Sequence, residues 1–225
     1  MAEAPVLSLR GVSKTFPGRG GAAPAEVLRD VHLEIGQGDK ASLVGSSGSG
    51  KSTLLSLMAG LLRPDSGTVA IDGVDLSTLG DADRARMRAQ RVGIALQSDN
   101  LISFLSAREN IELALGFTQR RGRETPQRAM ALLERFGVAE RADHRPRHLS
   151  GGEAQRVALA VAIANEPAVL LADEVVAALD GETAGQVVDE VLDAPFAVLY
   201  VTHDPALAQR VEHRYKLSDH RIEPG

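Results

Sequence analysis

The chain has 225 residues, which is enough for one large domain or a core with small subdomains attached. Its net charge of −5 argues against nucleic acid as the main partner, because proteins that bind a phosphate backbone usually carry excess basic charge. Cysteine is absent, which excludes disulfides, thiolate metal sites and a cysteine nucleophile. Aromatic residues make up 3% of the chain, so Leu, Val, Ile and Ala must build the core.

The first residues do not resemble a targeting segment. Met1–Pro5 lacks the basic region of a signal peptide, and no apolar region follows it. Elsewhere in the sequence no apolar segment reaches the roughly 20 residues that a membrane-spanning helix needs. We therefore expect no direct membrane insertion.

Three early segments alternate apolar and polar residues, as strands with one face in water do. A Gly-rich loop or hairpin tip, Gly18–Pro24, separates the first two of them. We expect these strands to form an antiparallel sheet packed beside the core: Val6–Val12, Val31–Ile35 and Thr68–Gly73.

A glycine-rich loop lies between a short strand-like segment, Lys40–Val44, and a helix-like segment, Ser52–Ala59. It fits G-x-x-x-x-G-K-[ST], the P-loop pattern, in which small residues let backbone N–H groups and a helix N-terminus converge on phosphates. The lysine of such a loop reaches the β- and γ-phosphates, and the following hydroxyl joins the Mg²⁺ shell. The sequence thus predicts a nucleoside triphosphate site formed by Gly45, Ser46, Ser47, Gly48, Ser49, Gly50, Lys51, Ser52 and Thr53.

Three later segments are continuous apolar runs, which is typical of parallel strands covered on both faces: Val92–Leu96, Ala168–Ala172 and Ala197–Val201. Polar residues follow each run at once. Ligands bind beyond the carboxyl ends of the strands in open α/β sheets. We therefore expect three strand ends to deliver polar groups to the edge where the P-loop lies: Gln97, Asp173 with Glu174, and Thr202–Asp204.

A mostly helical insert is predicted between Gln97 and the next core strand. Arg128–Phe136 forms a helix with Leu132, Leu133 and Phe136 on one side, stopped by Gly137. Next, Ser150, Gly151, Gly152 and Glu153 resemble a capping box that starts a long Ala-rich helix over residues 154–164. Two bare glycines at a helix start also predict a second anion site.

In order along the chain, these residues resemble the motifs of the ATPase subunit of an ATP-binding cassette (ABC) transporter. The match covers nearly the whole sequence, and within the family it looks most like the subgroup that serves lipoprotein-release, macrolide-export and cell-division-type permeases. The motifs are an aromatic A-loop residue, the Walker A loop, a Q-loop, the signature, Walker B, a D-loop and an H-loop: Phe16, 45–53, Gln97, 149–153, Asp173–Glu174, Leu179–Asp180 and His203.

The resemblance implies an α/β fold: a P-loop NTPase core with a parallel sheet, an N-terminal antiparallel β-subdomain and a helical signature subdomain. The whole chain, 1–225, would form one ABC ATPase domain. Its β-subdomain and core would comprise 1–97 and 165–225, with the helical subdomain at about 98–164.

The family also implies roles for single residues, with ATP and Mg²⁺ as ligands. Glu174 would be the general base, with His203, Gln97 and Lys51 as the other catalytic groups. The metal would be held by Ser52, Gln97 and, through water, Asp173. Phe16 would stack on adenine, unless it simply covers the small sheet.

The signature residues would complete the ATP site of a second copy, so two subunits would sandwich two ATP molecules. Ser150, Gly151, Gly152 and Glu153 would thus act in a homodimer formed in the ATP-bound state. The family further implies an integral membrane permease as partner and a cytoplasmic location, peripheral on the inner face of the membrane. Residues 97–110 would dock that permease.

The sequence departs from the family pattern at three places. Val175 and Val176 stand where Pro followed by Thr or Ser is usual after Walker B, which can lower catalytic rate even with Glu174 intact. The stretch 181–196 is several residues shorter than in close relatives. Residue 220 is His where the family usually has Gly, which suggests an altered turn.

The Val175–Val176 departure favours an alternative: a slow-hydrolysing, nucleotide-dependent switch that regulates a membrane partner. A P-loop kinase or GTPase is disfavoured, because no Asn-Lys-x-Asp motif is present and the signature would have no role. His144 and His148 have helical spacing, but Pro146 lies between them and no third metal ligand accompanies them.

Overall fold

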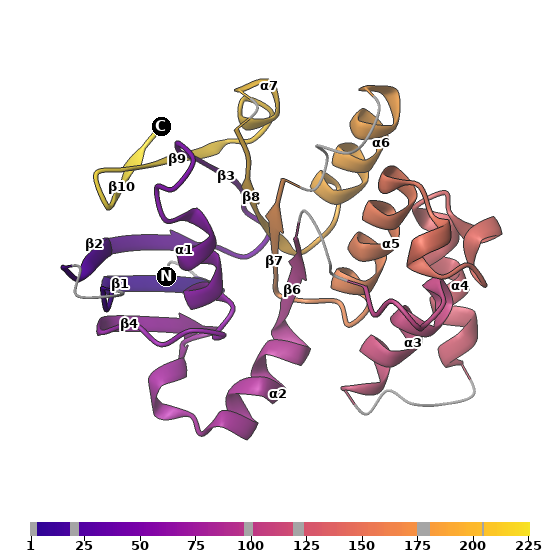
Figure 1. The fold of residues 1–225 in the computed structure, drawn as a ribbon, viewed down its shortest axis with the longest axis horizontal. Helices are drawn as coiled ribbons and strands as arrows, with labels where there is room; N and C mark the ends of the chain where they lie inside the picture. Colours follow the sequence, from indigo (N-terminus) through magenta and orange to yellow (C-terminus); the bar gives the residue numbers. More distant parts are fainter. Residues whose placement is uncertain (1–3, 19–22, 97–100, 119–123, 175–180, 204) are drawn as a thin grey trace.

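The structure, a computed structural model, describes residues 4–18, 23–96, 101–118, 124–174, 181–203 and 205–225. Within these residues the strands form two sheets, flanked by helices (Figure 1). The strands are β1 (Leu7–Phe16), β2 (Ala25–Ile35), β3 (Lys40–Val44), β4 (Ser66–Ile71), β5 (Val74–Asp75), β6 (Val92–Ala95), β7 (Val169–Asp173), β8 (Ala197–Val201), β9 (His213–Ser218) and β10 (Arg221–Pro224). The helices are α1 (Lys51–Met58), α2 (Asp81–Arg91), α3 (Ala107–Gly116), α4 (Thr125–Arg135), α5 (Gly151–Ile163), α6 (Gly181–Leu192) and α7 (Pro205–Ala208), with short 3-10 turns η1 (Leu76–Thr78), η2 (Ala139–Arg141) and η3 (Pro146–His148).

The first sheet is antiparallel, in the order β2-β1-β4-β5, as the alternating segments predict. In β2, Val31, Leu33 and Ile35 are buried while the residues between them are exposed, so one face packs on the core. Leu7 of β1 lies opposite both Ile35 and Ile71, which sets the register of the three long strands.

The second sheet has the order β10-β9-β3-β8-β7-β6 and is parallel except for the edge strand β10. It is covered on both faces, which explains its continuous apolar runs. Leu199 and Val201 of β8 pack in one core with α1 and the antiparallel sheet. Val198 and Tyr200 pack in a second core with α3, α4, α5 and α6.

The helices α3, α4 and α5 form a helical region on the side of the molecule away from the antiparallel sheet (Figure 1). Ser150 and Glu153 make the predicted capping box at the start of α5. The helix α4 ends before Gly137, whose φ is +63°, as expected of a left-handed helix stop. Leu133 and Phe136 are buried, which confirms the apolar side predicted for this helix.

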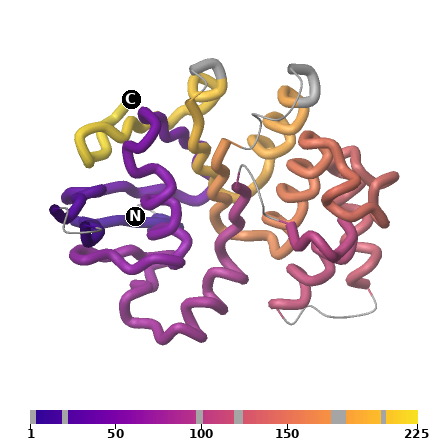
Figure 2. The backbone as a smooth tube through the Cα atoms, viewed as in Figure 1, coloured from indigo at the N-terminus to yellow at the C-terminus, as the bar shows by residue number. Residues whose placement is uncertain are grey.

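Several elements are not predicted from the sequence, among them α2, α3 and the C-terminal hairpin of β9 and β10. The hairpin, drawn in yellow in Figure 2, lies beside the indigo strand β2 of the other sheet. The backbone N–H of Arg29 in β2 donates to the carbonyl of His220 in the hairpin turn at 2.8 Å. The edges of the two sheets therefore meet at this turn. None of the helices in the described ranges is long and apolar enough to cross a membrane.

Candidate functional site

The P-loop connects the carboxyl end of β3 to the first turn of α1, as predicted. Gly50, the residue before the helix, has a φ of +106°, which L side chains rarely adopt. A Cβ atom there would lie 2.8 Å from Cγ1 of Val27 in β2. Glycine is therefore required at this position both by the backbone conformation and by the close packing of β2.

Lys51 folds back over the loop. Its Nζ donates to the carbonyl of Gly45 at 2.7 Å and to that of Ser46 at 2.9 Å. The first turn of α1 contains no acidic residue, and no side chain of the described residues caps it. Backbone N–H groups, the helix dipole and an ammonium group thus act together at this end of α1, an arrangement suited to phosphate.

Two carboxylates follow β7 at the same edge of the sheet. Burial raises the pKa of Asp173, the neighbouring Glu174 raises it further, and Lys51 opposes both effects. Glu174 has a φ of +49°, and its N–H donates to the carbonyl of Val201 in β8 at 2.9 Å. A left-handed conformation in a residue other than glycine costs on the order of 1–3 kcal/mol and persists where the surroundings hold it. Here the bond to β8 helps to hold the Glu174 backbone in place.

His203 extends from the segment after β8 toward the same carboxylate. Its Nδ1 lies 2.9 Å from Oε1 of Glu174. The Glu174 side chain is 21% exposed and that of His203 is 69% exposed, so the carboxylate is mostly buried while the imidazole is accessible to solvent. Two neighbouring strands, β7 and β8, therefore bring together the groups that the sequence places 29 residues apart.

A cavity of about 560 Å³ joins these groups to the P-loop and to the antiparallel sheet. Its lining confirms the predicted convergence at the loop for two of the three strand ends, those of β7 and β8. Ser46 and Ser49 belong to the loop without lining the cavity, and Gln97 lies outside the described residues. The lining residues are Phe16, Val27, Gly45, Ser47, Gly48, Gly50, Lys51, Ser52, Thr53, Asp173, Glu174 and His203.

Phe16 lies at the end of β1 and is 37% exposed. The Nζ of Lys14 lies 5.6 Å from the centroid of its ring, and the same ammonium pairs with Asp65 at 2.7 Å. One face of the ring is therefore near a fixed cation, and the residue also lines the cavity. This position suits an aromatic platform for a base bound in the same cavity as Lys51.

The signature residues are not part of that cavity. Ser150 Oγ accepts from the N–H of Glu153 at 3.2 Å, and a Glu153 carboxylate oxygen accepts from the N–H of Ser150 at 2.8 Å. The other carboxylate oxygen accepts from Arg141 Nε at 2.7 Å. These contacts, the Ser150 backbone N–H first and then Arg141, lower the pKa of Glu153 to about 2. Ser150 and Gly151 are exposed, so this helix start faces outward from the chain.

Two residues at the site were not predicted from the sequence. Val27 lines the cavity, but an apolar residue in a strand carries no signal for such a role. Gln155, buried within α5, donates to the carbonyl of Leu96 at 3.3 Å and thereby ties the signature helix to the end of β6. A glutamine next to a capping box likewise gives no sequence signal for a role at the site. The D-loop residues Leu179 and Asp180, and also Val175 and Val176, lie outside the described residues.

Comparison with known proteins agrees with this geometry. The family model described as ABC transporter matches residues 28–177. The chain is 42% identical, over 95% of both chains, to the lipoprotein-releasing system ATP-binding protein LolD of Paramagnetospirillum magneticum. It is 40% identical to the macrolide export ATP-binding/permease protein MacB 1/2 of Paracoccus denitrificans, of which it spans 34% of the length.

Solved structures agree as well. The ATP-binding cassette MJ0796, described as a dimer in a post-hydrolysis state bound to ADP and Pi, superposes with a TM-score of 0.91. It shares 36% sequence identity with the chain, with 96% of each covered. The chain belongs to the ABC transporter family and is an ATP-binding ATPase of that family.

Proposed function

We propose that this ATPase powers a separate integral membrane permease, on the cytoplasmic face of the membrane, through ATP-driven dimerisation. The observation that supports the proposal best is a division of the site. Glu174 and His203, two of the proposed catalytic groups, share one cavity with the P-loop, while the signature residues 150–152 lie outside it at the start of α5. A complete site therefore needs a second chain.

Within the cavity, Lys51 and the first turn of α1 would bind the β- and γ-phosphates, and Phe16 would stack on the base. Glu174 would accept the proton of the attacking water. Because His203 contacts the Glu174 carboxylate, it would orient that base and lie close to the γ-phosphate. Gln97 would complete this arrangement from the end of β6.

The residues present also fit Mg²⁺. The Ser52 hydroxyl and the Asp173 carboxylate line the same cavity, and oxygen donors of these kinds are the ligands that Mg²⁺ prefers. Burial beside a second carboxylate raises the pKa of Asp173. A cation bound nearby would lower that pKa and favour the ionised carboxylate. When bound, the ion would neutralise charge on the β- and γ-phosphates. Ser52, Asp173 and Gln97 would hold it.

The signature end would act on the partner's nucleotide. The capping box satisfies two backbone N–H groups within the chain and holds the glycines of α5 in place. Gly151 and Gly152 would then present their N–H groups to the γ-phosphate held by the other subunit. Size-exclusion chromatography coupled to light scattering tests this, since ATP must convert monomer to dimer under conditions of slow hydrolysis. A monomer at every ATP concentration would contradict the proposal.

The permease would dock on apolar surface near the Q-loop. Phe104 in the segment before α3 is 70% exposed, and Leu61 after α1 is 59% exposed. Leu61 also borders an apolar cavity of about 290 Å³ that reaches Ser52 and Asp173. Exposed large apolar residues often mark protein contacts. Docking here would connect the permease to the groups proposed to hold Mg²⁺.

Pull-down with the membrane protein encoded beside this chain tests the docking. Leu61→Asp and Phe104→Asp should abolish association while the chain alone still binds ATP. Retained association in both variants would place the docking surface elsewhere.

The alternative, a slow-hydrolysing switch, rests on Val175–Val176 and on the bond that engages Glu174 with His203. Measured turnover separates the two functions. Hydrolysis that the permease stimulates to one or more turnovers per second supports the transport role, whereas slow turnover with intact ATP-driven dimerisation supports the switch.

A further inference from the structure

The C-terminal hairpin turns through two residues that both adopt a left-handed backbone. Ser218 pairs with Arg221, and between them Asp219 has a φ of +47° and His220 a φ of +68°. This is the conformation of a type I′ turn, in which glycine is the favoured residue at the second position. Histidine is strained relative to glycine at this position, so a contact made by its side chain must account for the presence of histidine here.

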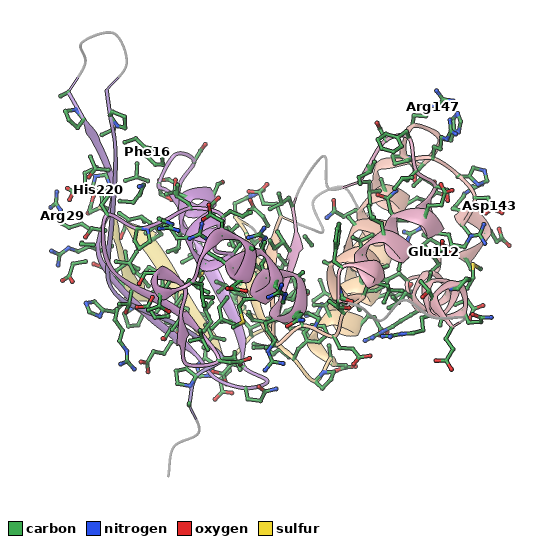
Figure 3. All side chains as sticks on the ribbon, turned by 90° about the horizontal axis from the view of Figure 1, so that it is seen from below. Phe16, Arg29, Glu112, Asp143, Arg147 and His220 are labelled. Atoms are coloured by element: carbon green, nitrogen blue, oxygen red, sulfur yellow. The ribbon has the colours of Figure 1, made fainter. Side chains whose placement is uncertain are left out.

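The ring of His220 reaches across to the edge of the other sheet. Its Nδ1 lies 3.2 Å from the carbonyl oxygen of Val27 in β2. A carbonyl only accepts, so the ring must donate a proton from Nδ1. The His220 carbonyl also accepts from the N–H of Arg29, two residues further along β2. In Figure 3, Phe16, Arg29 and His220 are labelled at the same end of the molecule.

Val27 connects this contact to the nucleotide cavity. It lines that cavity together with Phe16 and the P-loop. Its Cγ1 and its carbonyl oxygen lie 2.8 and 3.1 Å from the place where a Cβ on Gly50 would stand. Val27 is therefore wedged against the start of α1. The contact with His220 therefore restrains the backbone of a residue that packs against the P-loop.

We propose that His220 is a positioning residue for the base of the bound nucleotide. It anchors Val27, and with it the end of the β1–β2 hairpin that carries Phe16, at a set distance from the loop. This inference rests on the proposed placement of the base against Phe16. It assigns the Nδ1 atom of His220 a role that a glycine at this position cannot fill.

The rival explanation is that the ring only fastens the two sheets together and stabilises the fold. His220→Gly separates the two, because glycine relieves the left-handed strain while removing the contact to Val27. The full-length chain is used, with ATP and inorganic tripolyphosphate as probes. We expect unchanged tripolyphosphate affinity, ATP binding weakened about three- to tenfold, and an unchanged kcat at saturating ATP. The thermal midpoint should be equal to or above that of the wild type.

Two further variants serve as controls. Asp219→Gly relieves the neighbouring strained residue but keeps the ring, so its ATP affinity should equal that of the wild type. His220→Asn tolerates the left-handed conformation and carries an amide donor, so it should restore part of the lost affinity.

The outcomes distinguish this inference from the proposed function. If the wild-type chain binds ATP and His220→Gly binds it equally well, the inference alone is wrong. Equal weakening of ATP and tripolyphosphate would also overturn it, because the effect would then not concern the base. If the wild-type chain itself fails to prefer ATP over tripolyphosphate, the proposed placement of the base fails and the role of His220 fails with it.

Discussion

The helices α1 and α5 both have a glycine at their N-terminal end, yet their first turns are capped in different ways. Gly50 precedes α1 and offers no side chain, while Lys51 folds onto the loop carbonyls. Ser150 precedes α5 and forms a reciprocal capping box with Glu153, supported by Arg141. No side chain of the described residues caps α1, whereas side chains of the chain itself cap α5.

The difference indicates when each end acts. In the proposed function, the N–H groups at the start of α1 bind the phosphates of the chain's own ATP, so this end should respond to ATP in a single chain. The start of α5 is already ordered, so it can offer its glycines to a second chain with little further ordering. Variants at the start of α1 should therefore impair ATP binding or hydrolysis, and variants at the start of α5 should impair dimerisation.

The largest effect is expected from Glu174→Gln, which tests whether chemistry at the α1 end can be separated from binding. Loss of the proton acceptor should lower kcat by about 10²–10⁴-fold, since that is the typical contribution of a general base. ATP affinity should stay near that of the wild type, and the ATP-bound dimer should accumulate. Phosphate release and chromatography measure both, with the exposed Glu212→Gln as a matched control. Hydrolysis at the wild-type rate would show that Glu174 is not the base.

The next largest effect is expected from Lys51→Ala, which removes a charge-assisted phosphate contact. Binding of ATP to the monomer should weaken about ten- to a hundredfold. Calorimetric titration measures this, and Lys216→Ala on exposed β9 surface removes an equal charge elsewhere. If both variants bind ATP alike, the start of α1 is not the phosphate site.

A pair of substitutions at Ser150 tests the α5 end. Asn and Asp both cap helices about as well as Ser, so neither should change the thermal midpoint by more than a few degrees. Asp adds a negative charge where the partner's γ-phosphate is proposed to bind. Dimerisation and hydrolysis should therefore fall about tenfold in Ser150→Asp but not in Ser150→Asn, with ATP affinity of the monomer unchanged in both. Equal activity of the two variants would contradict the proposed role of α5, because its start would then bind no phosphate.

The smallest effect is expected on thermal stability at low pH, where the Glu153 carboxylate of the capping box becomes protonated. The pKa of Glu153 is lowered to about 2 in the folded chain, whereas an unperturbed Glu titrates near about 4.3. Its ionised form therefore contributes stability above about pH 4.3, and that contribution is lost as the pH falls toward 2. Thermal midpoints of the wild type and Glu153→Gln should converge over this range. Parallel curves would mean that Glu153 does not stabilise the cap.

The sequence predicted best those parts whose signal is local. The strands Lys40–Val44 and Ala197–Val201 have the bounds that their apolar runs predict, because both faces of each strand are covered. The capping box of α5 follows from four consecutive residues. A similar box, Ser106 with Glu109, starts α3 and carries the same local signal in the sequence.

Other features depend on contacts that no local pattern reports. None of the residues of α2 is buried, so the helix has no apolar stripe to detect. The departure at His220 was visible in the sequence, but its partner Val27 lies 193 residues earlier in the chain. The outward-facing start of α5 likewise follows from tertiary structure alone.

The pairing of β3 has a consequence for biosynthesis. The strand that leads into the P-loop is complete by residue 44, yet both of its neighbours come from the C-terminal part of the chain. Lys40 lies opposite Val198, and Ala41 lies opposite His213. On the ribosome, the loop proposed to bind phosphate must therefore wait for about 170 more residues before its strand is enclosed. Pairing across such a span closes slowly, so in a nascent chain β3 is enclosed only after β8 and β9 have been synthesised.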